Sequence, residues 1–93
     1  MKKEEFAEFI DQLYYGTEIV FEINNSKFFI QGWKENNICI MVLDSVNEEP
    51  FQGYLWQHQA STMKECADAF LSAPIWDGKD ILHIQDSVVW SDW

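Results

Sequence analysis

The sequence predicts a single α+β domain over residues 1–93. Three observations carry this prediction: a helical apolar period near the start, a strand-like alternation broken by an Asn-Asn pair at 24 and 25, and an apolar fraction of 47% with 16% aromatic residues. A chain of this size and composition can form one small core. We expect an N-terminal helix, a three- to four-stranded antiparallel meander, two C-terminal helices of which the second is short, and a short terminal strand, with the helices on one face of the sheet.

The first helix is expected at residues 3–15. Phe6, Phe9, Ile10 and Leu13 recur at i, i+3, i+4 and i+7, which places them on one apolar stripe. Acidic residues take the opposite face and the first turn, where they suit the helix dipole. Gly16 follows the stripe and is placed to end the helix in a left-handed cap.

A β-hairpin is expected at residues 18–33. Asn24-Asn25 separates two alternating stretches and suits a type I′ turn, because Asn tolerates positive φ better than most side chains. Such a turn sets a register with three recognisable pairs: Phe21 with Phe28 and Ile19 with Ile30 on the buried face, and Glu22 with Lys27 on the other face.

A second turn at residues 34–37 leads into a third strand at 38–43. This strand is apolar on both faces, which is typical of a central strand that is covered on each side. A polar loop follows over residues 44–53, and residues 54–58 are expected to form a short fourth strand.

The second helix is expected at residues 62–71, where Thr62 and Glu65 have the spacing of a capping box. Asp77 is the expected N-cap of a short helix that runs to about Gln85. Residues 88–90 are expected to form the last strand.

The charge of the chain excludes several classes of partner. The chain has sixteen acidic residues and six basic ones, all of them Lys, and its net charge is −10. Binding to a phosphate backbone needs Lys and Arg, and base readout depends strongly on Arg, so we expect no nucleic-acid partner. Anionic membrane surfaces are excluded for the same reason, and the longest apolar run, residues 38–43, is too short to span a bilayer. An acidic chain suits a basic protein surface, or serves solubility alone.

The two cysteines, Cys39 and Cys66, are too few for a disulfide framework and are expected to be free thiols. Met1 is followed by two lysines and then at once by acids, so no signal peptide is expected. We therefore expect a cytoplasmic protein.

Catalytic chemistry and metal binding have few candidates in this sequence. Cys66 with His58 or His83 is the only Cys/His combination considered for a nucleophile, and Cys66 lies on the inward stripe of its helix. The two Cys and two His are too widely separated for the close ligand pairs of a structural zinc site. We therefore expect no catalytic residue, metal or cofactor, and no pocket of about 300 Å³ or more.

The tryptophans are the candidate partner-binding residues. Five Trp exceed what a core of this size usually buries, and partly exposed Trp is a frequent anchor at protein interfaces. Trp33 lies at an expected strand end and Trp56 in the fourth strand, while Trp90 and Trp93 lie near the C-terminus. The alternative is that most of these rings close the edges of the core.

Two stretches of the chain resemble a known family. Residues 21–30, FEINNSKFFI, are similar to the F-x-Y-N-G-K-x-Y-x-I hairpin of a family of small uncharacterised proteins common in Firmicutes and their mobile elements. Residues 70–86 are similar to the D-G-K followed by L-x-E-I-W-D in that family, although Asn25, His83 and Gln85 replace its Gly, Glu and Trp. Some members carry the name aspartate ammonia-lyase, but that enzyme is a large helical tetramer, so the resemblance implies a fold and not this activity.

The function expected from these observations is that of a small acidic, non-enzymatic protein-binding module. Small acidic proteins of mobile elements often serve as immunity proteins, antitoxins or phage-encoded inhibitors. Two alternatives remain open. One is a small enzyme that uses scattered carboxylates or Cys66, and the other is a homodimeric structural or accessory protein with Trp90 and Trp93 at the contact.

Overall fold

The computed structural model of the chain describes residues 1–46 and 53–91. Its elements follow one another in the order α1 (Lys3–Tyr14), β1 (Ile19–Ile23), β2 (Ser26–Glu35), β3 (Ile38–Ser45), β4 (Trp56–Ala60), α2 (Met63–Ser72), the 3-10 helix η1 (Ile81–Ser87) and β5 (Val88–Ser91). The fold is therefore α+β, and its helices and strands occur in the predicted order.

The strands form one antiparallel sheet of five strands in the order β4-β3-β2-β1-β5. The predicted meander is confirmed in its four-stranded form, since β1 to β4 pair consecutively, and β5 joins as a fifth strand on the free side of β1. The apolar strand at residues 38–43 is an interior strand, as predicted, because β3 lies between β2 and β4. The expected cover on both of its faces is not met at Ile38, which is 43% exposed.

The two hairpins of the meander turn through Asn-Asn pairs. Asn24 and Asn25 have φ of 50° and 68°, and Asn36 and Asn37 have φ of 52° and 65°. Both positions of a type I′ turn need positive φ, which Asn supplies at low cost. The register predicted for the first hairpin is confirmed: Phe21 pairs with Phe28, Ile19 with Ile30, and Glu22 with Lys27.

Replacing Asn25 with Gly is expected to raise the free energy of unfolding slightly. Gly reaches positive φ at less cost than Asn, while its extra freedom in the unfolded chain offsets the gain by about 0.4–1 kcal/mol. Thermal melts of the variant measure the net effect, and Asn25→Ala is the matched control, because Ala disfavours this φ and should lower the melting temperature. A clear loss of stability in Asn25→Gly would contradict the turn assignment.

The predicted caps of the two α-helices are present. Gly16 has φ of 73°, and its N–H donates to the carbonyl of Leu13 while the N–H of Thr17 donates to the carbonyl of Gln12. These two bonds are those of a Schellman motif. At the start of α2, the Thr62 hydroxyl oxygen accepts a hydrogen bond from the Glu65 N–H at 3.2 Å.

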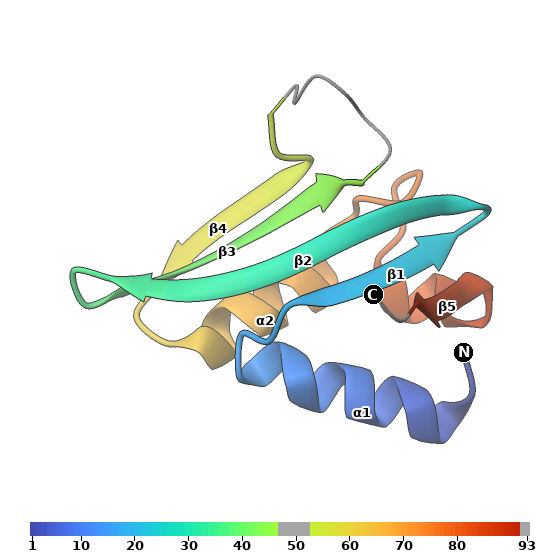
Figure 1. The fold of residues 1–93 in the computed structure, drawn as a ribbon, viewed down its shortest axis with the longest axis horizontal. Coiled ribbons are helices and arrows are strands. Elements are labelled where there is room, and N and C mark those ends of the chain that lie inside the picture. The colour runs from blue at the N-terminus through green and yellow to red at the C-terminus, as the bar shows by residue number, and fades with distance from the viewer. Residues whose placement is uncertain (47–52, 92–93) are drawn as a thin grey trace.

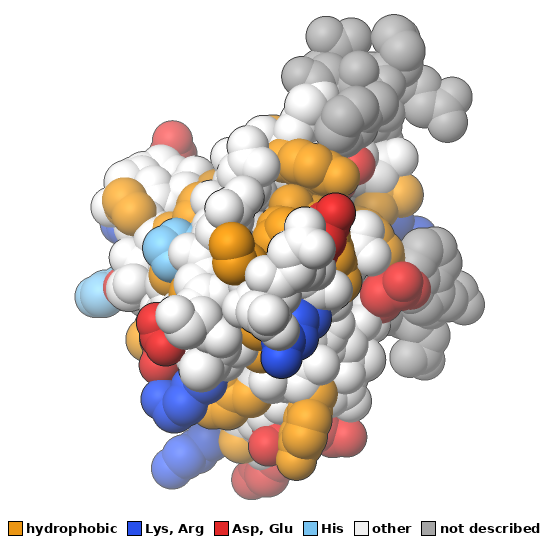
Figure 2. All heavy atoms as spheres, turned by 90° about the vertical axis from the view of Figure 1, so that its left-hand side faces the viewer, with side chains coloured by type: hydrophobic (Ala, Val, Ile, Leu, Met, Phe, Trp, Pro, Cys, Tyr) orange, Lys and Arg blue, Asp and Glu red, His pale blue; other side chains and the backbone are white. Residues whose placement is uncertain are grey.

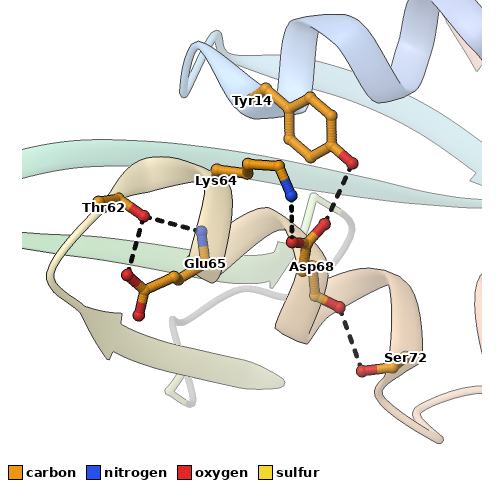
Figure 3. Close-up of polar contacts among 6 residues, drawn as sticks. All are labelled: Tyr14, Thr62, Lys64, Glu65, Asp68 and Ser72. Atoms are coloured by element: carbon orange, nitrogen blue, oxygen red, sulfur yellow. Dashed lines mark hydrogen bonds and ion pairs between the residues drawn. The ribbon is translucent and has the colours of Figure 1, made fainter.

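A polar contact joins the two α-helices on their solvent side (Figure 3). The Tyr14 hydroxyl donates to one carboxylate oxygen of Asp68 at 3.1 Å, and the Lys64 ammonium donates to the other at 2.9 Å. The hydrogen bond from Lys64 holds the pKa of the Asp68 carboxyl below its usual value. The group is exposed, so the contact orients α1 against α2 more than it stabilises the fold.

The residues after α2 depart from prediction at Asp77. Asp77 and Gly78 have φ of 57° and 78°, and the backbones of Trp76 and Lys79 exchange hydrogen bonds of 3.0 and 3.1 Å across them. Asp77-Gly78 thus forms a tight turn, because Asp and Gly both tolerate the positive φ that such a turn requires. The N-cap of η1 is Asp80, whose carboxylate accepts from the His83 N–H at 3.0 Å.

The core lies between the sheet and the helices. Figure 1 shows α1 and α2 on the same side of the sheet. One cluster of buried side chains fills the space between them, and its largest fully buried members are Phe9, Phe21, Phe70, Leu13, Ile19 and Ile30. Phe21, at the centre of β1, is 0% exposed and faces this cluster.

Within the described ranges, no helix is both long and apolar enough to cross a membrane.

Candidate interaction surface

The sheet has a second face, directed away from the helices, which we call the outer face. Its residues follow from the strand alternation and the pairing register. Pairing places them in cross-strand rows: Trp33–Ile40–Gln59, Gln31–Val42–Gln57, Val20–Phe29–Asp44, Glu35–Ile38, and Val89–Glu22–Lys27. None of the helices that the structure describes packs on this face, and the helix-side core cluster includes none of these residues.

Trp33 is the large ring at the turn end of the outer face. It lies directly opposite Ile40 of β3, and Ile38 follows in the next row and is 43% exposed. We call Trp33, Ile38 and Ile40 the Trp33 patch. Trp33 and Ile40 are half-buried, so part of each side chain is held in place by its neighbours while the rest faces solvent. Figure 2 views the molecule from the side of the β2–β3 turn and shows hydrophobic side chains on the upper, strand-bearing part of the surface.

Carboxylates outnumber amines on the outer face. Glu22, Glu35 and Asp44 lie on it beside a single Lys27, which is the cross-strand partner of Glu22. The indole N–H of Trp33 donates to the Glu35 carboxylate at 3.4 Å, so a negative charge lies directly at the edge of the Trp33 patch. The surface thus combines apolar side chains with negative charge, which is complementary to an apolar protein surface flanked by Lys or Arg.

A hollow of about 260 Å³ adjoins the Trp33 patch at the open edge of β4. It is lined by Asn37, Ile38, Gln59, Ala60 and Ser61. Ile38 belongs both to the patch and to the hollow, so the two features form one continuous surface from β2 to the edge of the sheet.

The structure does not gather the candidate tryptophans at one place. Trp56 and Trp90 lie on the helix side of the sheet and pack against the core, Trp56 on Phe70 with ring centroids 5.4 Å apart and Trp90 on Phe9 at 6.0 Å. Trp33 lies on the opposite face, and Trp93 lies outside the described residues. The rings of Trp56 and Trp90 therefore close edges of the core, as the alternative interpretation has it. Of the candidates that the structure describes, only Trp33 belongs to the outer face.

Both cysteines are buried and free. The Cys66 thiol donates to the Cys39 carbonyl at 3.4 Å, beneath the β3 strand. Burial is the main cause that raises the pKa of the Cys66 thiol, and the nearby Cys39 and Glu65 add to it. A raised pKa leaves less of the reactive thiolate at neutral pH, so this environment opposes nucleophilic chemistry.

Both thiols are expected to resist a bulky disulfide reagent in the native protein. Labelling should be at least about 100-fold slower than in the urea-unfolded chain, because it must wait for opening of the core. The measurement is the absorbance of the released thiolate over time, and an Ala7→Cys variant supplies an exposed thiol as the matched control. Fast labelling of native Cys66 would revive the enzyme interpretation.

A pocket of about 410 Å³ lies at the other end of the sheet, between the Asn24-Asn25 turn and the segment after α2. It is larger than expected for a chain of this size, because the 75–79 segment leaves an open hollow where it crosses the end of the hairpin. Its walls are partly apolar, and its polar lining residues are Asn24, Ser26, Asp77, Lys79 and Ser87. Among the described residues, the lining includes one carboxylate, Asp77, and one amine, Lys79, but no His or Cys.

The indole N–H of Trp76, a residue that also lines this pocket, is buried and has no hydrogen-bond partner among the described residues. Its ring packs edge-on against Phe28, with centroids 4.9 Å apart. This nitrogen is inaccessible to solvent, so a ligand in the pocket would not reach it without movement of the ring.

The histidines and acids form no metal centre within the described part of the chain, where no three His, Cys, Asp or Glu side chains lie close enough together to hold an ion. His83 contacts Asp80 at 2.6 Å, and this hydrogen bond holds the pKa of the Asp80 carboxyl below its usual value. His58 stacks on Trp56 with centroids 6.0 Å apart and is exposed.

Comparisons of the chain with protein-family models, with curated proteins and with solved structures gave no match, so its function is inferred from its own geometry.

Proposed function

We propose that this chain is a non-enzymatic protein-binding module that docks on a partner with a basic surface through the Trp33 patch. The observation that carries this proposal is the pairing of Trp33 with Ile40 on the outer face, beside the Glu35 carboxylate. An aromatic ring that is half-buried on a strand is already ordered before binding, so it loses little conformational entropy when a partner covers it.

The negative charge of the chain supports a basic partner. Glu35 lies beside the Trp33 patch, Glu22 and Asp44 lie elsewhere on the outer face, and the whole chain carries a net charge of −10. Charges of this sign accelerate encounter with a positively charged surface, while the buried aromatic anchor determines how long the complex lasts. The partner class is therefore a protein whose contact surface presents Lys or Arg around an apolar centre.

An immunity protein, an antitoxin or a phage-encoded inhibitor is the kind of module that fits this description. Small acidic proteins of mobile elements often have such roles, and the resemblance to a family from Firmicutes and mobile elements agrees with this proposal. A cytoplasmic location is part of the proposal, because both cysteines are free thiols.

The structure gives less support to the enzyme alternative than to the binding module. Cys66 is 0% exposed, and the pocket of about 410 Å³ combines a single carboxylate with a single amine among its described lining residues. The accessory-protein alternative places Trp90 and Trp93 at a homodimer contact. Trp90 packs edge-on against Phe9 and is half-buried, so less of its ring is free for such a contact.

The test is capture of partners from the native host with the tagged chain at low salt and at 0.15 M salt, followed by binding kinetics on the captured protein. We expect a basic protein whose association rate falls as salt rises, because screening shortens the reach of exposed charges to about 8 Å at 0.15 M. Trp33→Ala should raise the dissociation rate about 30-fold, the effect of an anchor that contributes about 2 kcal/mol.

Two variants serve as controls for this experiment. Trp33→Phe keeps a ring at the anchor position and should retain most of the affinity. Tyr15→Ala removes an aromatic side chain that is 78% exposed after α1 and does not belong to the outer face, and the variant should bind like the wild type. If no basic protein is enriched at low salt, or if Trp33→Ala binds as tightly as Tyr15→Ala, the proposal is wrong.

A further inference from the structure

The open edge of the sheet at β4 has the features of a pairing strand. β4 is the outermost strand next to β3, and its sequence is Trp-Gln-His-Gln-Ala. Exposed edges in soluble proteins are usually protected by Lys, Pro, a bulge or an inward charge, because unpaired backbone groups recruit other strands. The five residues of β4 contain no Lys, no Pro and no acidic side chain.

The pairing register identifies the backbone groups that face this edge. Glu35 and Ile38 close the two-residue Asn36-Asn37 turn, so they form a hydrogen-bonded pair, and alternate residues of β3 after Ile38 bond to β2. The intervening residues of β3 then bond to β4, regularly through its His58 and Ala60. At the start of the strand, where Leu43 lies opposite Trp56, the Leu55 N–H donates to the Leu43 carbonyl at 2.8 Å. Gln57 and Gln59 therefore direct their N–H and C=O groups outward, to the open side of β4.

These outward groups are compatible with a second copy of the same strand. The segment Gln57-His58-Gln59 reads the same in both directions. Two β4 strands placed antiparallel with Gln57 opposite Gln59 of the other copy would form two hydrogen-bonded pairs, with four backbone hydrogen bonds in all. The two His58 residues would face each other on the two-fold axis, and Trp56 would lie opposite Ala60 of the other copy.

Charge distribution favours this occupant over a foreign basic segment. The chain has a net charge of −10, but β4 itself has no charged side chain apart from His58. Pairing of β4 with its own copy therefore places no two carboxylates opposite each other along the strand. A basic segment from another protein would find no carboxylate on β4 itself. Gln57 and Gln59 are both exposed on the outer face, where their amides can bond across the junction.

We propose that the chain forms a two-fold symmetric dimer by antiparallel pairing of β4 with β4 of a second copy, which joins two five-stranded sheets into one of ten strands. In this dimer the row Trp33–Ile40–Gln59 of one copy continues into Gln57, Val42 and Gln31 of the other. The two Trp33 patches then lie on the same side of one continuous sheet. This dimer does not depend on the partner-binding role. It uses the backbone edge of β4 and shares with the candidate surface only the hollow at Gln59 and Ala60.

The test is a charge-swap at the two outward residues. In the variant Q57K/Q59K, each Lys meets a Lys of the other copy, and in Q57E/Q59E each Glu meets a Glu. Sedimentation equilibrium and native mass spectrometry should show a two-chain species for the wild type that grows with concentration. Each variant alone should have its dimer dissociation constant raised about tenfold or more, because like charges lie directly opposite. An equimolar mixture should recover a two-chain species with one copy of each variant.

The matched control is A7K/Q12K, which makes the same change of charge as Q57K/Q59K on α1, away from the sheet edge, and should dimerise like the wild type. Circular dichroism of every variant checks that the fold is retained, and the mixed sample is itself evidence of folding, since only folded edges can pair in register. A wild type that stays monomeric at all concentrations would overturn the proposal and leave the edge to a segment of another protein. A Q57K/Q59K variant that dimerises like the wild type, or a mixture that forms no mixed dimer, would also overturn it. None of these outcomes changes the Trp33→Ala test.

Discussion

Phe21→Ala is expected to lower the free energy of unfolding by about 3–5 kcal/mol, the cost of removing a buried Phe ring and leaving a cavity. Phe21 is 0% exposed at the centre of β1. The rings of Phe9, Phe28, Phe70 and Trp76 surround it, with centroids between 5.6 and 6.5 Å away. Because these rings come from α1, β2, α2 and the segment after α2, one substitution removes contacts to both α-helices at once.

Urea unfolding followed by Trp fluorescence measures this loss as a shift of the midpoint at an unchanged slope. Val89→Ala is the matched control, since Val89 is 55% exposed on the outer face of β5, and the change should stay within about 0.5 kcal/mol. A loss below about 1 kcal/mol for Phe21→Ala would mean that the ring is not at the centre of the core.

The strand pairing of the first hairpin could be predicted because local signals and packing agree there. Asn24-Asn25 specifies the turn, and the alternation on each side specifies which residues face the core. The position of β5 could not be predicted in the same way. Its pairing with β1 is a contact between segments far apart in the chain, and no turn chemistry links them. That contact makes β1 an interior strand, which the meander alone does not predict.

The candidate surface was harder to predict than the fold. Trp33 was identified as a candidate because it is a large ring near a turn, but its partners Ile38 and Ile40 were interpreted as residues of a covered strand. The signal that could have revealed them is the Asn36-Asn37 pair, since a two-residue turn there places Trp33 directly opposite Ile40. Trp56 is also a candidate, and the register of β4 against β3 decides on which face of the sheet its ring lies. No short turn links these two strands, so the sequence does not predict that register.

The second large effect is expected for Gly16→Val, which should lower the free energy of unfolding by about 2–3 kcal/mol, the cost of holding a non-glycine residue in a strained backbone conformation. Gly16 has φ of 73°, a region that β-branched side chains strongly disfavour. A Cβ at this position would also lie 3.2 Å from the carbonyl oxygen of Gly32 and 2.9 Å from the terminal methyl carbon of Met63. The Gly16 carbonyl accepts the Gly32 N–H at 3.3 Å, so strain at the end of α1 is transmitted directly to the middle of β2.

Gly16→Asn separates the two causes of this loss. Asn tolerates positive φ, so it keeps the contact of the added Cβ while removing most of the backbone strain. We expect Gly16→Asn to lose less than half as much stability as Gly16→Val in urea unfolding. Equal losses would assign the whole effect to the contact with Gly32 and Met63, in which case Met63→Ala should restore part of it. A stability of Gly16→Val equal to that of the wild type would show that the chain does not leave α1 through a left-handed cap.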